Sequence, residues 1–89
     1  MIEEIFVVKN NSGLHARPAT EFSKKAREFR SEITIFRGER AADAKSMLGI
    51  LTLSLNKGSE FSLVIRGEDE KEAMMAMRAF IDPLEADDL

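Results

Sequence analysis

The sequence contains no cysteine, tryptophan or tyrosine, and it has a single histidine, His15. Without cysteine there can be no disulfide, thiolate metal site or thiol nucleophile, and such a composition suits a reducing compartment. One histidine excludes a histidine-rich metal site, so a bound metal would need clustered acidic residues. No apolar run approaches the roughly 20 residues that cross a bilayer. The acidic start of the chain is unlike the basic start of a signal peptide. We therefore expect a cytoplasmic protein with no membrane contact.

What the chain does have suits a globular protein: 89 residues, 44% hydrophobic and 33% charged, which we interpret as one domain over residues 1–89. The net charge of −3 disfavours nucleic acid as a partner. Between Lys9 and Arg30 there are six basic and two acidic residues, whereas 68–89 holds eight acidic and two basic ones. The basic region around His15 would attract an anion or an acidic protein surface, unless these charges are only the solvated faces of helices.

Hydrophobic periodicity predicts seven elements. Alternation marks strands, as with Ile33 and Ile35, and a spacing of three or four marks helices, as from Ala16 through Ala19, Phe22 and Ala26 to Phe29. The predicted strands are 2–9, 32–37, 39–43 and 60–67, and the predicted helices begin at residues 16, 47 and 68.

The last helix should bury Ala73, Met77, Phe80 and Leu84 and end near Asp82, before Pro83. We expect the acidic segment 82–89 to be a frayed tail. Alternating strands with amphipathic helices predict an α+β fold of order βαββαβα. Its antiparallel sheet should carry all the helices on one face.

The segment SGLHARPAT, residues 12–20, carries the only histidine. Gly13 allows a sharp turn, and Pro18 fits the first turn of a helix, so His15 should lie at or just before the helix N-cap. Orphan backbone N–H groups and the positive helix end there attract anions and disfavour an imidazolium. Arg17 adds a charge-assisted hydrogen-bond donor. This combination suits a histidine that accepts and releases a phosphoryl group. A surface histidine that merely caps the helix is the alternative, and these arguments alone leave the two about equal.

A second motif is AKSMLGILTLSL, residues 44–55. Ser46 before an apolar helical run is expected first of all as an N-cap. A phosphate there would be tolerated by the helix N-terminus and would add negative charge beside Met47 and Leu48. At least one of these two side chains should point outward, and core packing is the alternative for both.

Together these segments resemble the histidine-containing phosphocarrier (HPr) family of the bacterial sugar phosphotransferase system. SGLHARPAT is similar to that family's active-site motif, AKSMLGILTLSL to its regulatory-serine region, and VIRGEDEKEAM to its final strand and helix. The resemblance covers nearly the whole chain. It implies an open-faced β-sandwich in which three helices cover one face of a four-stranded antiparallel sheet.

The resemblance also implies a function. Enzyme I, itself charged by phosphoenolpyruvate, would phosphorylate His15 at Nδ1, and the phosphoryl group would pass to an enzyme II A domain and on to sugar. Arg17 would assist the transfer, with phosphate support at Ser12, Ala16 and Pro18, although Ser12 could equally just end the turn. An HPr kinase/phosphorylase would act on Ser46 where the host has one, and a transcriptional regulator could bind that form. No cofactor or metal is implied. The protein would be a shuttle with a covalent intermediate rather than a stand-alone enzyme, and we expect a monomer.

Partners should dock over one surface. Thr20, Lys24 and Arg27 lie on one side of the first helix, and the second helix adds four apolar or small residues, Met47, Leu48, Gly49 and Leu51. Phosphate on Ser46 would then repel partners with acidic rims.

Other interpretations fit less well. A paralogue of the nitrogen-regulatory branch would keep His15 and is the runner-up. A purely regulatory homologue would lack the histidine, and an acylphosphatase-like enzyme would need a phosphate-cradling loop that is missing. A nucleic-acid module would expose strand aromatics, whereas Phe6, Phe36 and Phe61 each fit the apolar phase of a strand.

Overall fold

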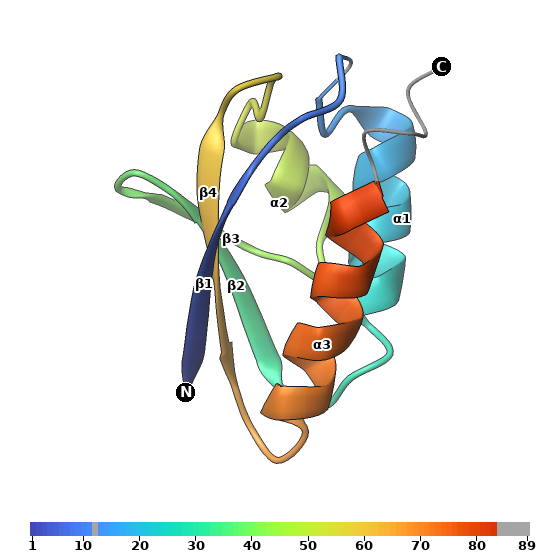
Figure 1. Cartoon of the computed structure of the whole chain (residues 1–89), viewed down its shortest axis with the longest axis vertical. Coiled ribbons are helices and arrows are strands. Elements are labelled where there is room, and N and C mark those ends of the chain that lie inside the picture. The colour runs from blue at the N-terminus through green and yellow to red at the C-terminus, as the bar shows by residue number, and fades with distance from the viewer. Residues whose placement is uncertain (12, 84–89) are drawn as a thin grey trace.

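The computed structural model describes residues 1–11 and 13–83. In this part of the chain the elements follow in the order βαββαβα (Figure 1), as the sequence predicts. They are β1 (Ile2–Val7), α1 (Ala16–Ala26), β2 (Glu32–Arg37), β3 (Arg40–Asp43), α2 (Met47–Thr52), β4 (Glu60–Arg66) and α3 (Glu70–Ile81). Leu84 and the rest of the acidic tail to Leu89 lie outside the described residues.

The strands form one antiparallel sheet in the order β1-β4-β2-β3. The alternation predicted for β2 is present, since Ile33 and Ile35 are buried while their neighbours Glu32 and Thr34 are not. Ile33 pairs with Ile65 of β4, whose inward positions are also buried. Because a strand turns successive side chains to opposite faces, β2 and β4 present one continuous apolar face at the centre of the sheet.

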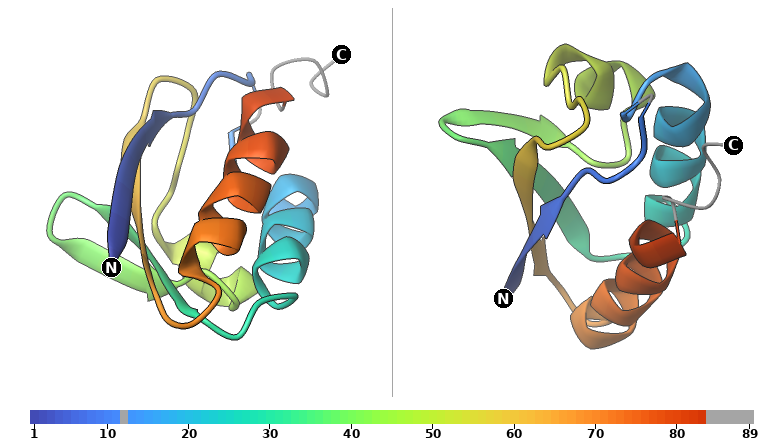
Figure 2. Two further views of the ribbon diagram at one scale, coloured as in Figure 1. Left: turned by 60° about the horizontal axis from the view of Figure 1, so that its bottom comes forward. Right: turned by 45° about the horizontal axis from the view of Figure 1, so that its top comes forward.

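All three helices cover that apolar face and leave the other face of the sheet open (Figure 2). Phe22 of α1 joins the layers, because its ring lies 6.3 Å from that of Phe61 in β4 and 5.8 Å from that of Phe80 in α3. A fully buried side chain of this size stabilises the fold by about 1.5–3 kcal/mol relative to exposure. The predicted open-faced sandwich is therefore confirmed.

Several side chains depart from the predicted faces. Ala16 is exposed, because the buried face of α1 starts only at Ala19, and Phe29 lies beyond the end of the helix and is half-buried. Phe36 does not fit the apolar phase of β2: it alternates with Ile35 and therefore lies on the open face, opposite Ser62. In α3, Met74 is buried as well as Ala73 and Met77, since this helix packs against both the sheet and α1.

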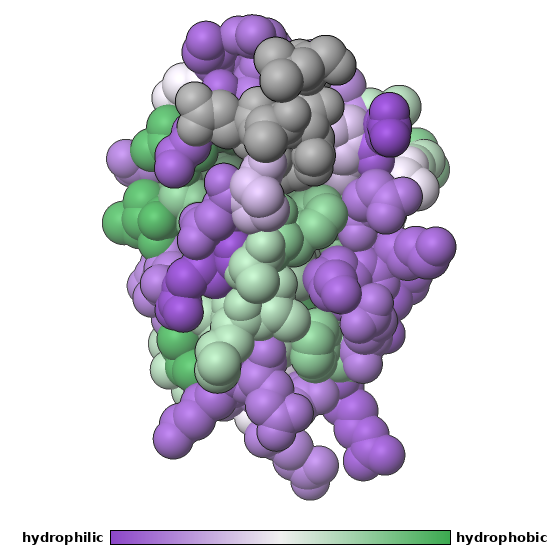
Figure 3. Space-filling model, turned by 45° about the vertical axis from the view of Figure 1, so that its right-hand side comes forward, coloured by the Kyte–Doolittle hydropathy of each residue, from purple (hydrophilic) through white to green (hydrophobic). Residues whose placement is uncertain are grey.

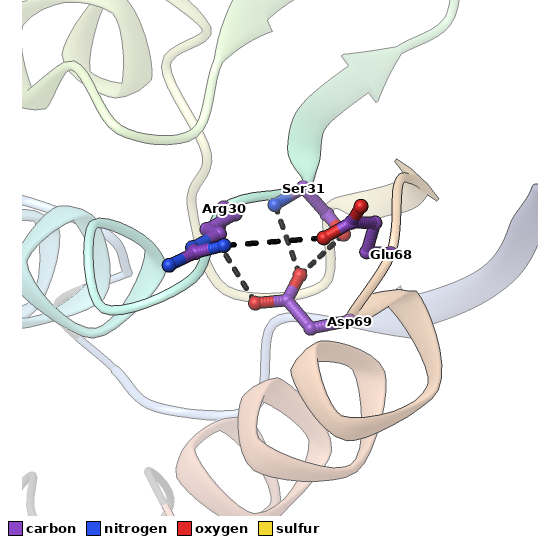
Figure 4. A network of polar contacts seen from close by, with 4 residues as sticks. All are labelled: Arg30, Ser31, Glu68 and Asp69. Atoms are coloured by element: carbon purple, nitrogen blue, oxygen red, sulfur yellow. Dashed lines mark hydrogen bonds and ion pairs between the residues drawn. The ribbon is translucent and has the colours of Figure 1, made fainter.

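The start of β2 is bound to the start of α3 by the Asp69 carboxylate (Figure 4). Asp69 accepts hydrogen bonds from the Ser31 hydroxyl and from the backbone N–H groups of Arg30 and Ser31, the last two at 2.9 Å. The Ser31 hydroxyl and then the Arg30 amide hold the pKa of Asp69 below its usual range. Glu68 adds an exposed ion pair with Arg30 at 4.0 Å. One carboxylate thus joins two elements that are far apart in sequence.

Exposed hydrophobic residues are not confined to one place. On the side shown in Figure 3 they form a strip between hydrophilic residues, and Met75 on the outer face of α3 is 65% exposed. An exposed apolar side chain alone therefore does not identify a docking surface on this molecule. No helix within residues 1–11 and 13–83 is long and apolar enough to cross a membrane.

Candidate functional site

The loop between β1 and α1 places His15 at one end of the helical layer. Gly13 has a φ of +67°, and Leu14 N–H donates to Leu55 O at 2.8 Å. A Cβ atom on Gly13 would lie 2.3 Å from that same carbonyl oxygen. Only glycine therefore combines this left-handed backbone with the close approach to Leu55. The buried Leu14 side chain anchors the loop directly before His15.

His15 is the N-cap residue of α1. Its backbone is extended, with φ −84° and ψ −166°, and its carbonyl accepts the first intrahelical hydrogen bond, from Ala19 N–H at 2.8 Å. The side chain is exposed and makes no capping hydrogen bond with the helix. His15 is therefore a surface residue at the N-cap, as both interpretations expect, and its imidazole does not cap the helix and is accessible to a partner.

The surroundings of His15 favour an anion. The first turn of α1 contains no acidic residue, and the backbone N–H groups of Ala16 and Arg17 precede the first intrahelical hydrogen bond. The Arg17 side chain is exposed and has no ion pair among the described residues. Pro18 is half-buried within the first turn, where its missing N–H costs no hydrogen bond. Ser12 lies outside the described residues.

Ser46 is the N-cap of α2, as predicted. Its Oγ accepts a hydrogen bond from Gly49 N–H at 3.0 Å, and its own carbonyl accepts one from Ile50 N–H at 3.0 Å. The side chain is half-buried rather than enclosed. Ser46 is therefore a structural cap whose hydroxyl stays close to the surface.

The two helices lie side by side and run in opposite directions, because the chain after α2 contacts the loop before α1 and the chain before α2 contacts the end of α1. Thr20 Oγ1 donates to Ala16 O at 2.6 Å and lies 2.9 Å from Sδ of Met47. About two helical turns further along the chain, at the C-cap of α1, Arg27 Nη1 donates to Lys45 O at 3.4 Å. The flank of α1 predicted for docking thus faces the residues around Ser46, and Figure 1 shows α2 packed beside α1.

The remaining docking candidates differ in exposure. Leu48 is 70% exposed, and Lys24 is exposed on α1. Met47, Gly49 and Leu51 are half-buried, because Ile50 is the residue by which α2 enters the core. Leu48 thus fulfils the expectation that one of the pair Met47 and Leu48 points outward.

Lys45 is a positioning residue that the sequence reasoning missed. Its Nζ donates to Phe29 O at 2.8 Å, and its N–H donates to Asp43 Oδ1 at 2.9 Å. The bond to Phe29 ties the segment before Ser46 to the chain that follows α1, and the bond to Asp43 is local to that segment. Its place directly before Ser46 was the available signal, but the contact with Phe29 requires the fold. Within the described part of the chain no three His, Cys, Asp or Glu side chains gather as a metal site would require.

A known family fits this arrangement of an exposed histidine and a neighbouring serine cap. Residues 2–82 match the family model described as the phosphotransferase-system HPr component phosphorylation site. The chain belongs to the HPr family. It is therefore an HPr-family phosphocarrier protein, as the two motifs indicated.

Relatives carry several names. The HPr-like protein Crh of Halalkalibacterium halodurans is 43% identical over 92% of this chain and 98% of its own length. A phosphocarrier protein HPr of Lysinibacillus sphaericus is 42% identical over 85% and 86%. A phosphocarrier protein NPr of Shewanella violacea is 41% identical over 91% and 89%. Overall identity thus does not separate these three kinds of relative.

The fold agrees with a solved member of the family. The crystal structure of HPr-C-His from Thermoanaerobacter tengcongensis superposes with a TM-score of 0.93 over the whole of both chains, at 36% identity. The likeness extends over the full sheet and all three helices.

Proposed function

We propose that His15 accepts a phosphoryl group from phosphorylated enzyme I and passes it to an enzyme II A domain during sugar uptake. The observation that carries this proposal is the exposed imidazole at the N-cap of α1, with no capping bond to the helix and no acidic residue in the first turn. A histidine kept only for stability would use its side chain in the fold.

The transfer needs a ring nitrogen with a free lone pair. In the loading step the lone pair of Nδ1 attacks phosphorus, a P–N bond forms, and the bond from phosphorus to the donor breaks with its electron pair leaving to the donor. In the unloading step the acceptor's nucleophile attacks phosphorus and the P–N bond to His15 breaks. The protein is unchanged after one cycle, as a carrier requires.

The first turn of α1 stabilises the transferring group. The N–H groups of Ala16 and Arg17 supply hydrogen-bond donors at the positive end of the helix. The Arg17 guanidinium, which no described partner fixes, can follow the phosphoryl oxygens as charge moves between donor and acceptor. The partner proteins complete the transition-state environment, so the carrier needs no pocket of its own at this site.

Ser46 is the proposed control point. Phosphorylation by an HPr kinase/phosphorylase would place about two negative charges at the start of α2. The helix N-terminus tolerates this charge, so the domain stays folded. The charge would lie beside Met47 and the flank of α1 and repel a partner with an acidic rim. A transcriptional regulator that recognises phosphoserine could use the same surface.

The sugar-transport branch is favoured over the nitrogen-regulatory branch by the segment around Ser46. There Leu48 is 70% exposed and Ser46 caps α2 at the surface, which gives a serine kinase both a hydroxyl and an apolar contact. We place the protein in the cytoplasm, where carriers of this family meet enzyme I, and propose that it acts as a monomer through small transient interfaces.

A relay experiment tests the whole proposal. Phosphoenolpyruvate, enzyme I, this protein and a glucose-type enzyme II A domain are mixed, and phosphorylation of the A domain is followed by mass spectrometry. We expect label on the A domain only when this protein is present, and none with His15→Ala. The variant Arg66→Ala on β4 is the matched control on the sheet, because its ion pair is with Glu32 of β2 and involves no residue of α1. Equal transfer by His15→Ala would refute the proposal, and a preference for a nitrogen-branch A domain would favour the runner-up.

A further inference from the structure

A second candidate site lies away from the His15 surface, between β1 and the end of α3. The described residues there enclose a cavity of about 320 Å³, which is at the lower end of the range for pockets that hold small molecules, about 300–1,000 Å³. The hydrophobic part of its lining comes from β1, the loop before α1, β4 and α3, and includes Phe6, Val8, Leu14, Phe61 and Ile81.

Asn10 gives this cavity a specific polar feature. Its side chain lines the cavity and is only 3% exposed, and its Oδ1 has no hydrogen-bond partner among residues 1–11 and 13–83. The amide orientation is fixed, because Nδ2 donates to Gly13 O at 2.7 Å and a flipped amide would bring two oxygens together. A buried acceptor without a donor costs about 1–3 kcal/mol. Such an atom marks a place where a donor is missing.

The rest of the lining defines the ligand. Phe6 and Phe61 stack with their ring centroids 5.5 Å apart and offer an aromatic wall. Of the charged lining residues, Arg78 and Glu4 satisfy each other in an ion pair at 2.7 Å. Lys9 and Asp82 also line the cavity and are exposed, so Asn10 Oδ1 is the buried acceptor of the lining that lacks a partner among the described residues.

We propose that this cavity is a binding site for a small molecule with an aromatic or aliphatic body and one hydrogen-bond donor. The apolar body packs against Phe6 and Phe61, and a hydroxyl or N–H group of the ligand donates to Asn10 Oδ1. The site is separate from the phosphoryl-transfer chemistry, but Leu14 forms part of its wall and directly precedes His15. A ligand bound in the cavity would therefore contact the loop that positions His15.

The test uses three probes of similar size on the full-length protein. Benzyl alcohol carries a hydroxyl donor, benzyl methyl ether has an oxygen that cannot donate, and toluene has no polar atom. Each is titrated to millimolar concentration while amide and methyl resonances are followed by NMR. We expect benzyl alcohol to bind about tenfold more tightly than the ether or toluene. Nuclear Overhauser contacts should connect its ring to methyl groups of Leu14 and Ile81.

Two variants test whether the preference for a ligand with a hydrogen-bond donor arises at Asn10. Asn10→Ala should bind alcohol and ether with equal affinity, whereas the matched control Asn11→Ala, at an exposed neighbour, should keep the tenfold preference. Thermal unfolding checks that both variants fold. If Asn10→Ala does not fold, the comparison of the three probes on the wild-type protein still tests the proposal. The proposal is overturned if the alcohol and the ether bind the wild type equally. It is also overturned if the contacts map outside the cavity, or if no probe binds, since the cavity would then hold only water.

Discussion

Thr20 Oγ1 lies 2.9 Å from Sδ of Met47, and this contact joins the helix that begins at His15 to the helix that begins at Ser46. Thr20 also donates to Ala16 O, so it lies one turn from the start of α1. A partner that covers His15 and extends by one turn along α1 therefore reaches Met47. This proximity gives a physical basis for control of one site by charge at the other.

The first prediction concerns that control. Ser46→Asp should slow phosphoryl transfer from enzyme I to His15 by at least about tenfold, because like charges brought together at an interface cost several kcal/mol. Aspartate is a good N-cap, so the variant should remain folded. Initial rates of loading at several ionic strengths provide the measurement, and added salt should reduce the difference.

Ser46→Ala is the control for this prediction. It removes the hydrogen bond from Gly49 N–H without adding charge, so the loading rate should stay within about twofold while unfolding becomes about 1 kcal/mol easier. If Ser46→Asp is phosphorylated on His15 at the wild-type rate, charge at Ser46 does not control loading. If both variants are slowed equally, the loss of the N-cap causes the effect.

The second prediction separates catalysis from stability at Arg17. Arg17→Ala should lower the kcat/KM for loading by at least about tenfold, because the transferring phosphoryl group loses a cationic donor. The thermal midpoint should not change, since no ion pair in the described chain uses this exposed side chain. Arg17→Lys should recover part of the rate by supplying a charge without the bidentate geometry. A stability loss equal to the activity loss would contradict the assignment.

The third prediction concerns the loop that presents His15. Gly13→Ala would bring a Cβ atom to 2.3 Å from Leu55 O at a φ of +67°. We expect it to destabilise the protein by more than about 2 kcal/mol and to slow His15 loading, since both the clash and the left-handed backbone act against it. Urea unfolding and the loading assay check both effects.

Gly38→Ala is a matched control, because Gly38 has a similar φ of +60° and nothing within 4 Å of an added Cβ. Gly38→Ala should lower the free energy of unfolding by only about 1 kcal/mol, from backbone strain, and should leave the rate of His15 phosphorylation unchanged. If the two variants lose equal stability, the close approach of Gly13 to Leu55 does not matter.

The fourth prediction is a pH dependence of stability from Asp69. Its pKa is lowered in the folded state by the Ser31 hydroxyl and the Arg30 and Ser31 amides, whereas in the unfolded chain it returns to about 3.9. The ionised carboxylate therefore contributes stability that is complete above about pH 5 and is lost as the pH falls through the lower folded pKa. Asp69→Asn should be destabilised more at pH 6 than at pH 3 in urea unfolding.

Glu68→Gln provides the comparison for Asp69. Its carboxylate lies 4.0 Å from Arg30, with both side chains 88% exposed, so this pair should contribute little at any pH. An Asp69→Asn variant whose deficit does not change with pH would show that the hydrogen bonds, and not the charge, supply the stabilisation.

The elements were predictable because their patterns are local. The alternation of Ile33 and Ile35 marks β2, and Ser46 before an apolar run marks the start of α2 even with Gly49 inside the helix. The position of His15 at the helix start also follows from its neighbours Gly13 and Pro18.

Contacts between distant segments were not predictable in the same way. Phe36 is a different case, because the alternation that buries Ile33 and Ile35 already turns Phe36 to the open face, and its apolar character alone misled the prediction. The contact of Lys45 with Phe29 depends on how separate elements pack, and so does the burial of Asn10 Oδ1 without a partner in the described part of the chain. Periodicity carries no information about such pairings, so these features appear only with the structure.

The central claim is that His15 carries the phosphoryl group, and intact-mass measurement of loading tests it most directly. The protein is incubated with phosphoenolpyruvate, magnesium and enzyme I, and its mass is recorded before and after acid treatment. The account predicts the mass gain of one phosphoryl group that is lost in acid, is absent in His15→Ala and persists in Ser46→Ala. An acid-stable gain, or an equal gain in His15→Ala, would contradict it.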